Sequence, residues 1–200
     1  MSLFYTGVGS RETPGYILDI MVKLGYYLSA AGITLRTGGA PGADQAFEEG
    51  WWKHQIWDGD GTSNGRIYIP WNGFYDRLHH GDAFGAVVSL SHIPYDLGVR
   101  AQQIAQQFHP AWEHLSPGAK KLHTRNVFQV LGDDLETPSE FLICFAIPNK
   151  DGSVQGGTNT AVKLAKAHGV RVTNLHNEES RGWATEWIKR MEDRYGTIPE

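Results

Sequence analysis

Three glycine-rich segments constrain this chain most strongly, because each lies at a junction between strand-like and helix-like sequence. The first, Gly7–Arg11, follows the strand-like run 3–6, and the second, Thr37–Asp44, follows the run 33–36 and opens a helix-like stretch. The third, Gly156–Thr160, opens another helix-like stretch. Glycine lets a backbone approach a ligand closely, and a helix start supplies free N–H groups and a positive dipole end. Three such junctions favour a phosphate-bearing, nucleotide-like ligand.

Strand-like and helix-like patterns alternate along the chain, which predicts a parallel sheet with right-handed crossovers. The predicted strands are 3–8, 33–37, 66–70, 140–147 and 170–175, and the predicted helices are 14–31, 43–52, 97–108, 117–131, 158–168 and 178–194. Residues 55–64 are predicted to form an exposed polar loop, and 71–115 to contain an irregular, aromatic-rich excursion. We expect one domain over 1–200, with a three-layer, Rossmann-like α/β fold, a mainly parallel sheet and helices on both faces. Ligands of such sheets bind beyond the carboxyl ends of the strands, where the strand order reverses.

The composition excludes few functional classes. The net charge of −4 argues against a strongly basic nucleic-acid-binding surface. The single cysteine, Cys144, lies inside the apolar run 141–147, so we expect a buried side chain and no disulfide. No signal-peptide pattern and no long apolar stretch is present, so we expect a cytoplasmic protein with no membrane partner.

Motifs for catalysis or metal binding are not recognisable. His79 and His80 are neighbours, but no HExxH or Cys–His spacing accompanies them, so we predict no metal site. No Gly-x-Ser-x-Gly motif and no Ser–His–Asp arrangement stands out. We therefore predict no catalytic residue and no required cofactor, only a nucleotide ligand.

The candidate ligand-binding residues come from the three glycine-rich segments and from the predicted helix 117–131. They are Gly7, Gly9, Ser10, Arg11, Gly38, Gly39, Ala40, Gly42, Ala43, Asp44, Arg125, Asn126, Gly156, Gly157, Thr158, Asn159 and Thr160. The N–H groups of Gly39 to Ala43 are predicted to bind phosphate. Asp44 either bonds a ribose hydroxyl or holds the loop, and the second role is favoured because a carboxylate repels an anion.

The remaining polar candidates each have a structural alternative. Ser10 and Arg11 either donate to phosphate or lie at the surface beside a helix start. Thr158 and Thr160 suit helix capping as well as phosphate binding. Arg125 and Asn126 lie among core-spaced residues of their helix, so they are either ligand contacts or structurally paired side chains.

The chain is rich in aromatic residues, including seven tryptophans. Trp71 and Tyr75 follow the third predicted strand directly and are the candidates for stacking on a base. The alternative is that the aromatic residues fill the core and an oligomer interface, where tryptophan is enriched. We expect a homodimer or a higher homo-oligomer.

These segments together resemble the SLOG superfamily, the Rossmann-like group that includes the DNA-processing protein DprA and the LOG-type nucleotide phosphoribohydrolases. The resemblance lies in Tyr5–Arg11, in Gly38–Asp44, in Gly156–Val162 and in the pair Arg125-Asn126, and it spans most of the chain. The overall pattern is also similar to short DprA-like proteins encoded by bacteriophages. This resemblance implies nucleotide binding and a homo-oligomer, and a location in the host cytoplasm if the protein is phage-encoded.

One departure from the LOG pattern bears on catalysis. Aligning Gly156 and Gly157 with the paired glycines of LOG enzymes places Lys163 where those enzymes carry their glutamate. A cation cannot replace a carboxylate that stabilises an oxocarbenium-like sugar. Three functions follow as hypotheses. The first is binding of a nucleotide derivative without turnover, such as sequestration of a host defence messenger by a phage protein. The others are a LOG-like N-glycosidase with a rearranged acid and DprA-like binding of single-stranded DNA, against which the net charge argues.

Overall fold

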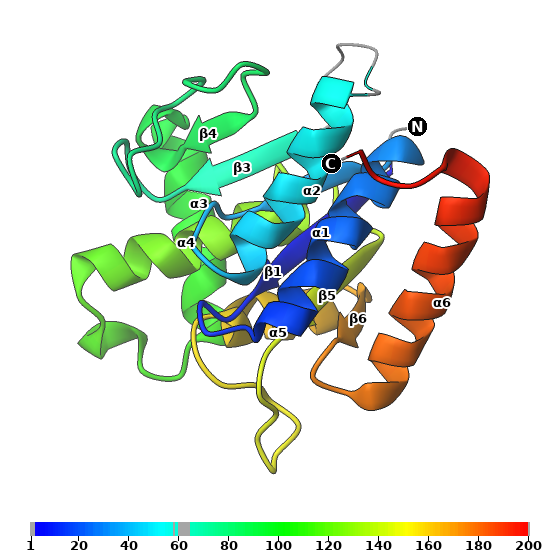
Figure 1. The fold of residues 1–200 in the computed structure, drawn as a ribbon. Coiled ribbons are helices and arrows are strands. Elements are labelled where there is room, and N and C mark those ends of the chain that lie inside the picture. Colours follow the sequence, from blue (N-terminus) through cyan, green and yellow to red (C-terminus); the bar gives the residue numbers. More distant parts are fainter. Residues whose placement is uncertain (1–2, 58, 60–64, 200) are drawn as a thin grey trace.

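The structure is a computed structural model that describes residues 3–57, 59 and 65–199. Six parallel strands form one sheet in the order β4-β3-β2-β1-β5-β6. Their bounds are β1 Phe4–Gly9, β2 Thr34–Thr37, β3 Gly65–Ile69, β4 Val87–Ser89, β5 Phe141–Phe145 and β6 Arg171–Asn174. The ribbon in Figure 1 shows this twisted sheet running through the middle of the molecule. The prediction of a parallel α/β sheet is confirmed.

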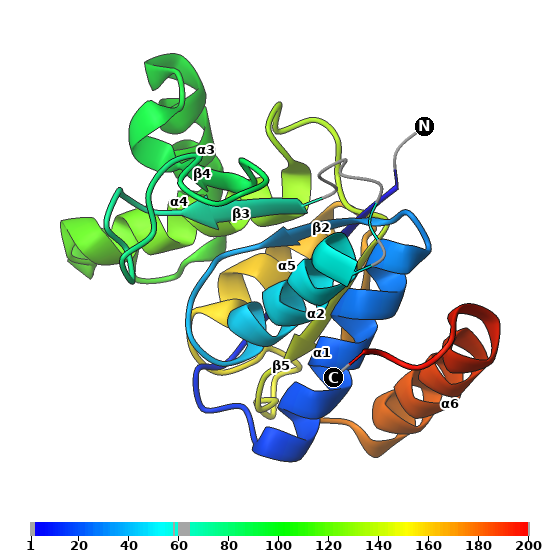
Figure 2. The ribbon, with the colours of Figure 1, turned by 45° about the horizontal axis from the view of Figure 1, so that its top comes forward.

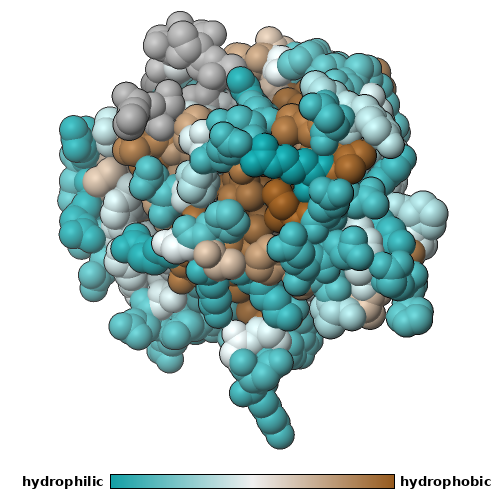
Figure 3. Space-filling model, turned by 180° about the vertical axis from the view of Figure 1, so that it is seen from behind, coloured by the Kyte–Doolittle hydropathy of each residue, from teal (hydrophilic) through white to brown (hydrophobic). Residues whose placement is uncertain are grey.

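Helices cover both faces of the sheet, which gives the three predicted layers (Figures 1 and 2). The first face carries α1 Gly15–Ala30, α2 Ala43–Trp57 and α6 Glu178–Tyr195, and the second carries α3 Tyr95–Phe108, α4 Pro117–Leu131 and α5 Thr158–Ala167. Two 3-10 turns, η1 Leu90–His92 and η2 Trp112–His114, flank α3. Seen from behind, the second face has apolar surface near its centre with polar side chains around it (Figure 3).

The direction of winding reverses between β1 and β5. Tyr5 of β1 pairs with Leu35 of β2 on one side and with Phe141 of β5 on the other. From β1 the chain adds β2, β3 and β4 in turn towards one edge of the sheet. Helices α3 and α4 then connect β4 to β5, which pairs with the other side of β1, and β6 follows beyond β5. The carboxyl ends of β1 and β5 therefore flank the switch point, where connecting chains diverge and leave a crevice.

Residues of β1, β3, β4 and β5 divide between two apolar clusters, one on each face of the sheet. In β5, Ile143 packs with the α1–α2 side, while Leu142 and Cys144 pack with the α4–α5 side. Cys144 is fully buried, as predicted. A strand with apolar residues on both faces reads as a continuous hydrophobic run, which is why 140–147 could be recognised from sequence.

Helices α1 and α2 cross so closely that their backbones are in contact. A Cβ atom at Gly25 of α1 would overlap the carbonyl oxygen of Phe47, and one at Gly50 of α2 would overlap that of Val22. Only glycine allows two helices to come so close. The first two glycine-rich segments, which lead into α1 and α2, are therefore held in a fixed relation to each other.

Two sequence predictions are wrong in detail. The segment 71–91 is irregular over its first part, but Val87–Ser89 forms β4 beside β3. This strand of three residues is too short to show a period of two. In the predicted polar loop, α2 continues to Trp57, and Gln55 is buried and donates a hydrogen bond to Ser29 Oγ; residues 58 and 60–64 lie outside the described residues.

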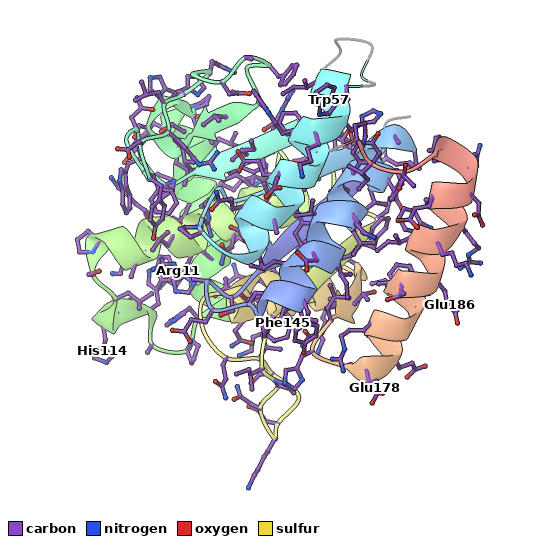
Figure 4. The ribbon with its side chains drawn as sticks, viewed as in Figure 1. Arg11, Trp57, His114, Phe145, Glu178 and Glu186 are labelled. Carbon is purple, nitrogen blue, oxygen red and sulfur yellow. The ribbon has the colours of Figure 1, made fainter. Side chains whose placement is uncertain are left out.

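Most of the tryptophans pack against the two clusters. Trp51 and Trp112 are buried, and Trp52, Trp71, Trp183 and Trp187 are partly buried against the first cluster. Trp57, at the end of α2, is 57% exposed (Figure 4). Six of the seven tryptophans thus pack within the chain and do not require an oligomer interface. In the described part of the chain, no helix combines the length and apolar character needed to cross a membrane.

Candidate functional site

A cavity of about 370 Å³ opens at the switch point, and we call it the switch-point cavity. The end of β1, the loop after it, helix α4 and the start of α5 surround it. The predicted residues that line it are Gly9, Ser10, Arg11, Ala40, Asp44, Arg125, Asn126, Gly156, Gly157 and Thr158. The fold therefore brings parts of all three glycine-rich segments and the Arg-Asn pair to one place.

Asp44 joins the first and second glycine-rich segments. It lies in the first turn of α2, is only 3% exposed, and its Oδ1 accepts a hydrogen bond from Gly9 N at 3.2 Å. The backbone groups of Gly38 and Ala40 also act to lower the pKa of this carboxyl group. The Ala43 N–H donates to Ser10 O. The Asp44 carboxylate thus holds the loop, the favoured of its two predicted roles, and the Ala43 N–H serves the fold, while phosphate binding by the other N–H groups of Gly39 to Ala43 stays a prediction.

Arg125 and Asn126 tie α4 to the second and third segments. Arg125 Nη1 donates to Gly38 O at 2.8 Å and lies 3.8 Å from Asp44 Oδ2. Arg125 Nη2 donates to Asn126 Oδ1, and Asn126 Nδ2 donates to Gly157 O at 2.9 Å. One connected network thus runs from Gly9 through Asp44, Arg125 and Asn126 to the third segment. Most polar side-chain atoms of Arg125 and Asn126 are thus bonded within the protein, as expected if the two residues are structurally paired rather than ligand contacts.

The buried charges of this network have shifted pKa values. Burial raises the pKa of Asp44, and Arg125 together with the three backbone groups acts in the opposite direction. Burial likewise lowers the pKa of Arg125, and Asp44 opposes that shift. Each group makes the ionised form of the other tolerable in the interior, because an opposite charge offsets part of the desolvation cost.

The remaining glycine candidates are explained by packing. A Cβ atom at Gly7 would meet the Phe47 ring, and one at Gly42 would meet the backbone of Ser10 and Arg11. Gly39 has φ +62, which glycine adopts readily. Thr160 is buried with its Oγ1 bonded to His123 Nδ1, and Asn159 Oδ1 accepts from Val154 N.

The predicted stacking residues do not line the switch-point cavity. Trp71 packs edge-on against Phe74 and contributes to the first apolar cluster. Tyr75 packs against the same phenylalanine from a left-handed backbone conformation, with φ +48. The two aromatic rings therefore pack within the irregular segment after β3 and are not placed to stack on a base in this cavity.

The third segment differs from the other two, because packing does not explain its glycines. It follows a hairpin that projects from the carboxyl end of β5, with a bridge between Pro148 and Val154 (Figure 1). A Cβ atom at Gly156 or Gly157 would meet nothing within 4 Å. Gly156 has φ +72, but Gly157 has φ −63, which any residue adopts, and it precedes α5 without a side-chain cap.

The entrance of the cavity carries two exposed charges. Arg11 and Glu12 follow β1 and line the cavity, and Figure 4 shows Arg11 on the side of the molecule away from α6. Among the described residues, Arg11 forms no ion pair, whereas Arg77 and Arg125 are both paired with carboxylates. Arg11 is therefore the cation at this cavity that remains available to an anionic ligand.

Comparison with models of known protein families, with curated proteins and with solved structures finds no match to this chain. The function must therefore be argued from the site itself.

Four polar lining residues are absent from the sequence prediction: Glu12, His123, Gln129 and Gln155. His123 lies two residues before Arg125 on α4, and burial, His109 and Arg125 lower its pKa to about 4. It is therefore neutral at pH 7. Lys163, at the position of the LOG glutamate, does not line the cavity. No group of three or more metal-ligating side chains exists among the described residues.

Proposed function

We propose that this protein binds a phosphate-bearing nucleotide derivative in the switch-point cavity and does not turn it over. The observation that carries the proposal is Gly157. Its backbone conformation and its surroundings would accept a side chain, yet the chain has none there, directly before the first turn of α5. A Ser, Thr, Asp or Asn at this position would cap the helix. Glycine keeps the helix start accessible to an anion from outside.

The phosphate is assigned to the entrance of the cavity. The N-terminus of α5 contributes its dipole and backbone N–H groups, and Arg11 contributes a guanidinium with a fork of donors. Both come from opposite sides of the same opening, the loop after β1 and the loop after β5. The volume of about 370 Å³ lies near the lower end for small-molecule sites. It suits a mononucleotide or a cyclic nucleotide, and an ADP-ribose-like ligand would extend through the opening.

Binding without turnover is supported by the state of two titratable groups that line the cavity, His123 and Asp44. His123 has a pKa of about 4 and is unsuited to deliver a proton at pH 7. Asp44 is engaged by the Gly9 N–H and Arg125. Sequestration of a host defence messenger by a phage protein, in the host cytoplasm, extends this proposal and rests on the resemblance to short phage DprA-like proteins of the SLOG superfamily.

A LOG-like N-glycosidase is the second candidate, and Glu12 is the observation that favours it. Its carboxylate lies on the lining of the cavity and takes part in no ion pair among the described residues. Chromatography of reactions with AMP and related nucleotides would detect free base. Release of base that disappears in Glu12→Gln would establish the enzyme and overturn the proposal of binding alone.

Binding itself is tested by calorimetry with a panel of nucleoside monophosphates, cyclic nucleotides and ADP-ribose. Gly157→Leu should weaken binding at least tenfold because its side chain enters the space assigned to phosphate. Gly182→Leu is the matched control, since a Cβ atom at Gly182 of α6 also meets nothing within 4 Å, away from the cavity. If wild type binds no member of the panel at millimolar concentration, the proposal fails.

The expected homodimer is a separate proposal. The number of tryptophans does not require an interface, because six of the seven pack within the chain. Trp57 and its neighbour Ile56 are the exposed apolar residues that would enter an interface at the end of α2. Light scattering at micromolar concentration, with and without nucleotide, tests the assembly; a monomer mass in both states would remove it.

A further inference from the structure

We call the part of the switch-point cavity lined by the buried residues Asp44, Arg125 and Gln129 its floor, and this floor contains a polar side chain without a hydrogen-bond partner. Gln129 of α4 lines the cavity and is 0% exposed. Neither its Oε1 nor its Nε2 has a hydrogen-bond partner in the described structure. Its backbone carbonyl is used, since it accepts from Thr6 Oγ1 at 2.6 Å. A buried amide with neither atom bonded is costly, so it calls for an explanation.

A second buried donor belongs to the same helix, one turn earlier. Arg125 Nε is also without a hydrogen-bond partner, although both Nη atoms of this side chain are bonded. Arg125 and Gln129 are four residues apart, so they lie on the same face of α4. Both residues line the cavity, so its wall contains one unbonded acceptor and two kinds of unbonded donor.

The floor does not suit phosphate. Its two charges, Asp44 and Arg125, are 3.8 Å apart and offset each other. A phosphate placed here would be desolvated beside the Asp44 carboxylate, whereas the entrance offers it Arg11 and the start of α5. A polar ligand group at the floor must therefore be uncharged and must contain both a donor and an acceptor.

We propose that Gln129 reads the donor–acceptor edge of a nucleobase whose phosphate lies at the entrance. This inference rests on the proposed function and extends it: the cavity selects its ligand at the floor by an amide and holds it at the entrance by charge. A glutamine amide can form two hydrogen bonds to the edge of a base at once, one donated by its Nε2 and one accepted by its Oε1. The ribose diol is the other uncharged group with this chemistry, and the test separates the two.

The test measures affinities of wild type, Gln129→Leu and Gln129→Met for nucleoside 5′-monophosphates and for ribose 5-phosphate. We expect wild type to bind at least one monophosphate at least tenfold more tightly than ribose 5-phosphate. Both variants should lose about 10- to 100-fold for that nucleotide and less than threefold for ribose 5-phosphate. Gln103→Leu, the same change on exposed α3, is the control and should change neither affinity.

Thermal unfolding gives a readout that does not depend on the ligand. Because Gln129→Leu removes an unbonded amide from the interior, its unliganded melting temperature should equal or exceed that of wild type. A clear drop would mean that the amide is satisfied within the fold, and the inference would be wrong.

The outcomes separate the two proposals. If wild type binds neither nucleotides nor ribose 5-phosphate, the proposed function fails. If wild type binds nucleotides and both Gln129 variants bind them equally well, only the inference about the floor is overturned. An equal loss for ribose 5-phosphate would assign Gln129 to the sugar and likewise overturn it. Should neither variant fold, a wild-type preference for nucleotide over ribose 5-phosphate below tenfold would be the refuting result.

Discussion

Removing the charge of Asp44 should destabilise the whole domain, and the structure sets the size of the effect. At 3.8 Å, the separation of Arg125 Nη1 and Asp44 Oδ2, two unit charges attract by about 4 kcal/mol at an effective dielectric constant of about 20. Asp44→Asn retains an oxygen for Gly9 N but leaves the buried guanidinium without a counter-charge. We expect the free energy of unfolding to fall by about 3–4 kcal/mol, a large part of the roughly 5–15 kcal/mol of a typical domain.

A double-mutant cycle isolates the interaction. Arg125→Met should cost a similar amount, since it removes the same pair and the bond to Gly38 O. The variant with both changes contains no buried charge at this point, so its loss should be smaller than the sum of the two by about 2 kcal/mol or more. Urea denaturation with a constant m-value provides the measurement.

The surface pair Lys23–Glu192 is the matched control. Its atoms are closer, at 3.2 Å, but its side chains are 48% and 30% exposed. Lys23→Met and Glu192→Gln should show a coupling of about 0–1 kcal/mol. If Asp44 and Arg125 couple by no more than this surface pair, the network does not hold the three segments together in the way argued above.

Two further predictions concern titration and reactivity. The pKa of His123 is lowered from 6.5 to about 4. The unfolded chain therefore binds this proton more tightly, and stability is lost as the pH falls from about 6.5 towards 4. Between pH 7 and pH 4.5, urea denaturation should show a smaller loss of stability for His123→Gln than for wild type, and equal losses would contradict the lowered pKa. Burial raises the pKa of the Cys144 thiol to about 12, so native protein at pH 8 should react with an aromatic disulfide reagent only at its rate of unfolding. Labelling as fast as that of a small free thiol would show that Cys144 is accessible.

The sequence was sufficient to predict the elements whose periodicity is long. Helices such as α1 and α4 show apolar residues at helical spacing, and β5 is a continuous apolar run. From their alternation the parallel sheet, the switch point and the meeting of the glycine-rich segments all follow. Strand β4 could not be predicted, because three residues carry no period and its pairing with β3 depends on tertiary contacts.

The roles of individual glycines could not be predicted. In the sequence Gly7, Gly42 and Gly157 look alike, yet the first two are required by neighbouring atoms and the third is not. The distinction depends on what lies within 4 Å of each Cα, which only the folded chain defines. Gln129 was missed for a related reason, because an amide among core-spaced residues of a helix gives no sign that the fold leaves it unbonded.

The close crossing of α1 and α2 has a consequence for how the cavity can open and close. Because Gly25 and Gly50 bring the two helix backbones together, neither helix can slide or rotate without a steric clash. The loops after β1 and β2 then move as one rigid unit. The opposite wall, formed by the projecting hairpin and the start of α5, lies outside this constraint and is bonded to α4 both from Asn126 Nδ2 to Gly157 O and between His123 Nδ1 and Thr160 Oγ1. The hairpin and the start of α5, which the proposed function assigns to phosphate, are therefore the part of the cavity wall that the α1–α2 crossing does not constrain.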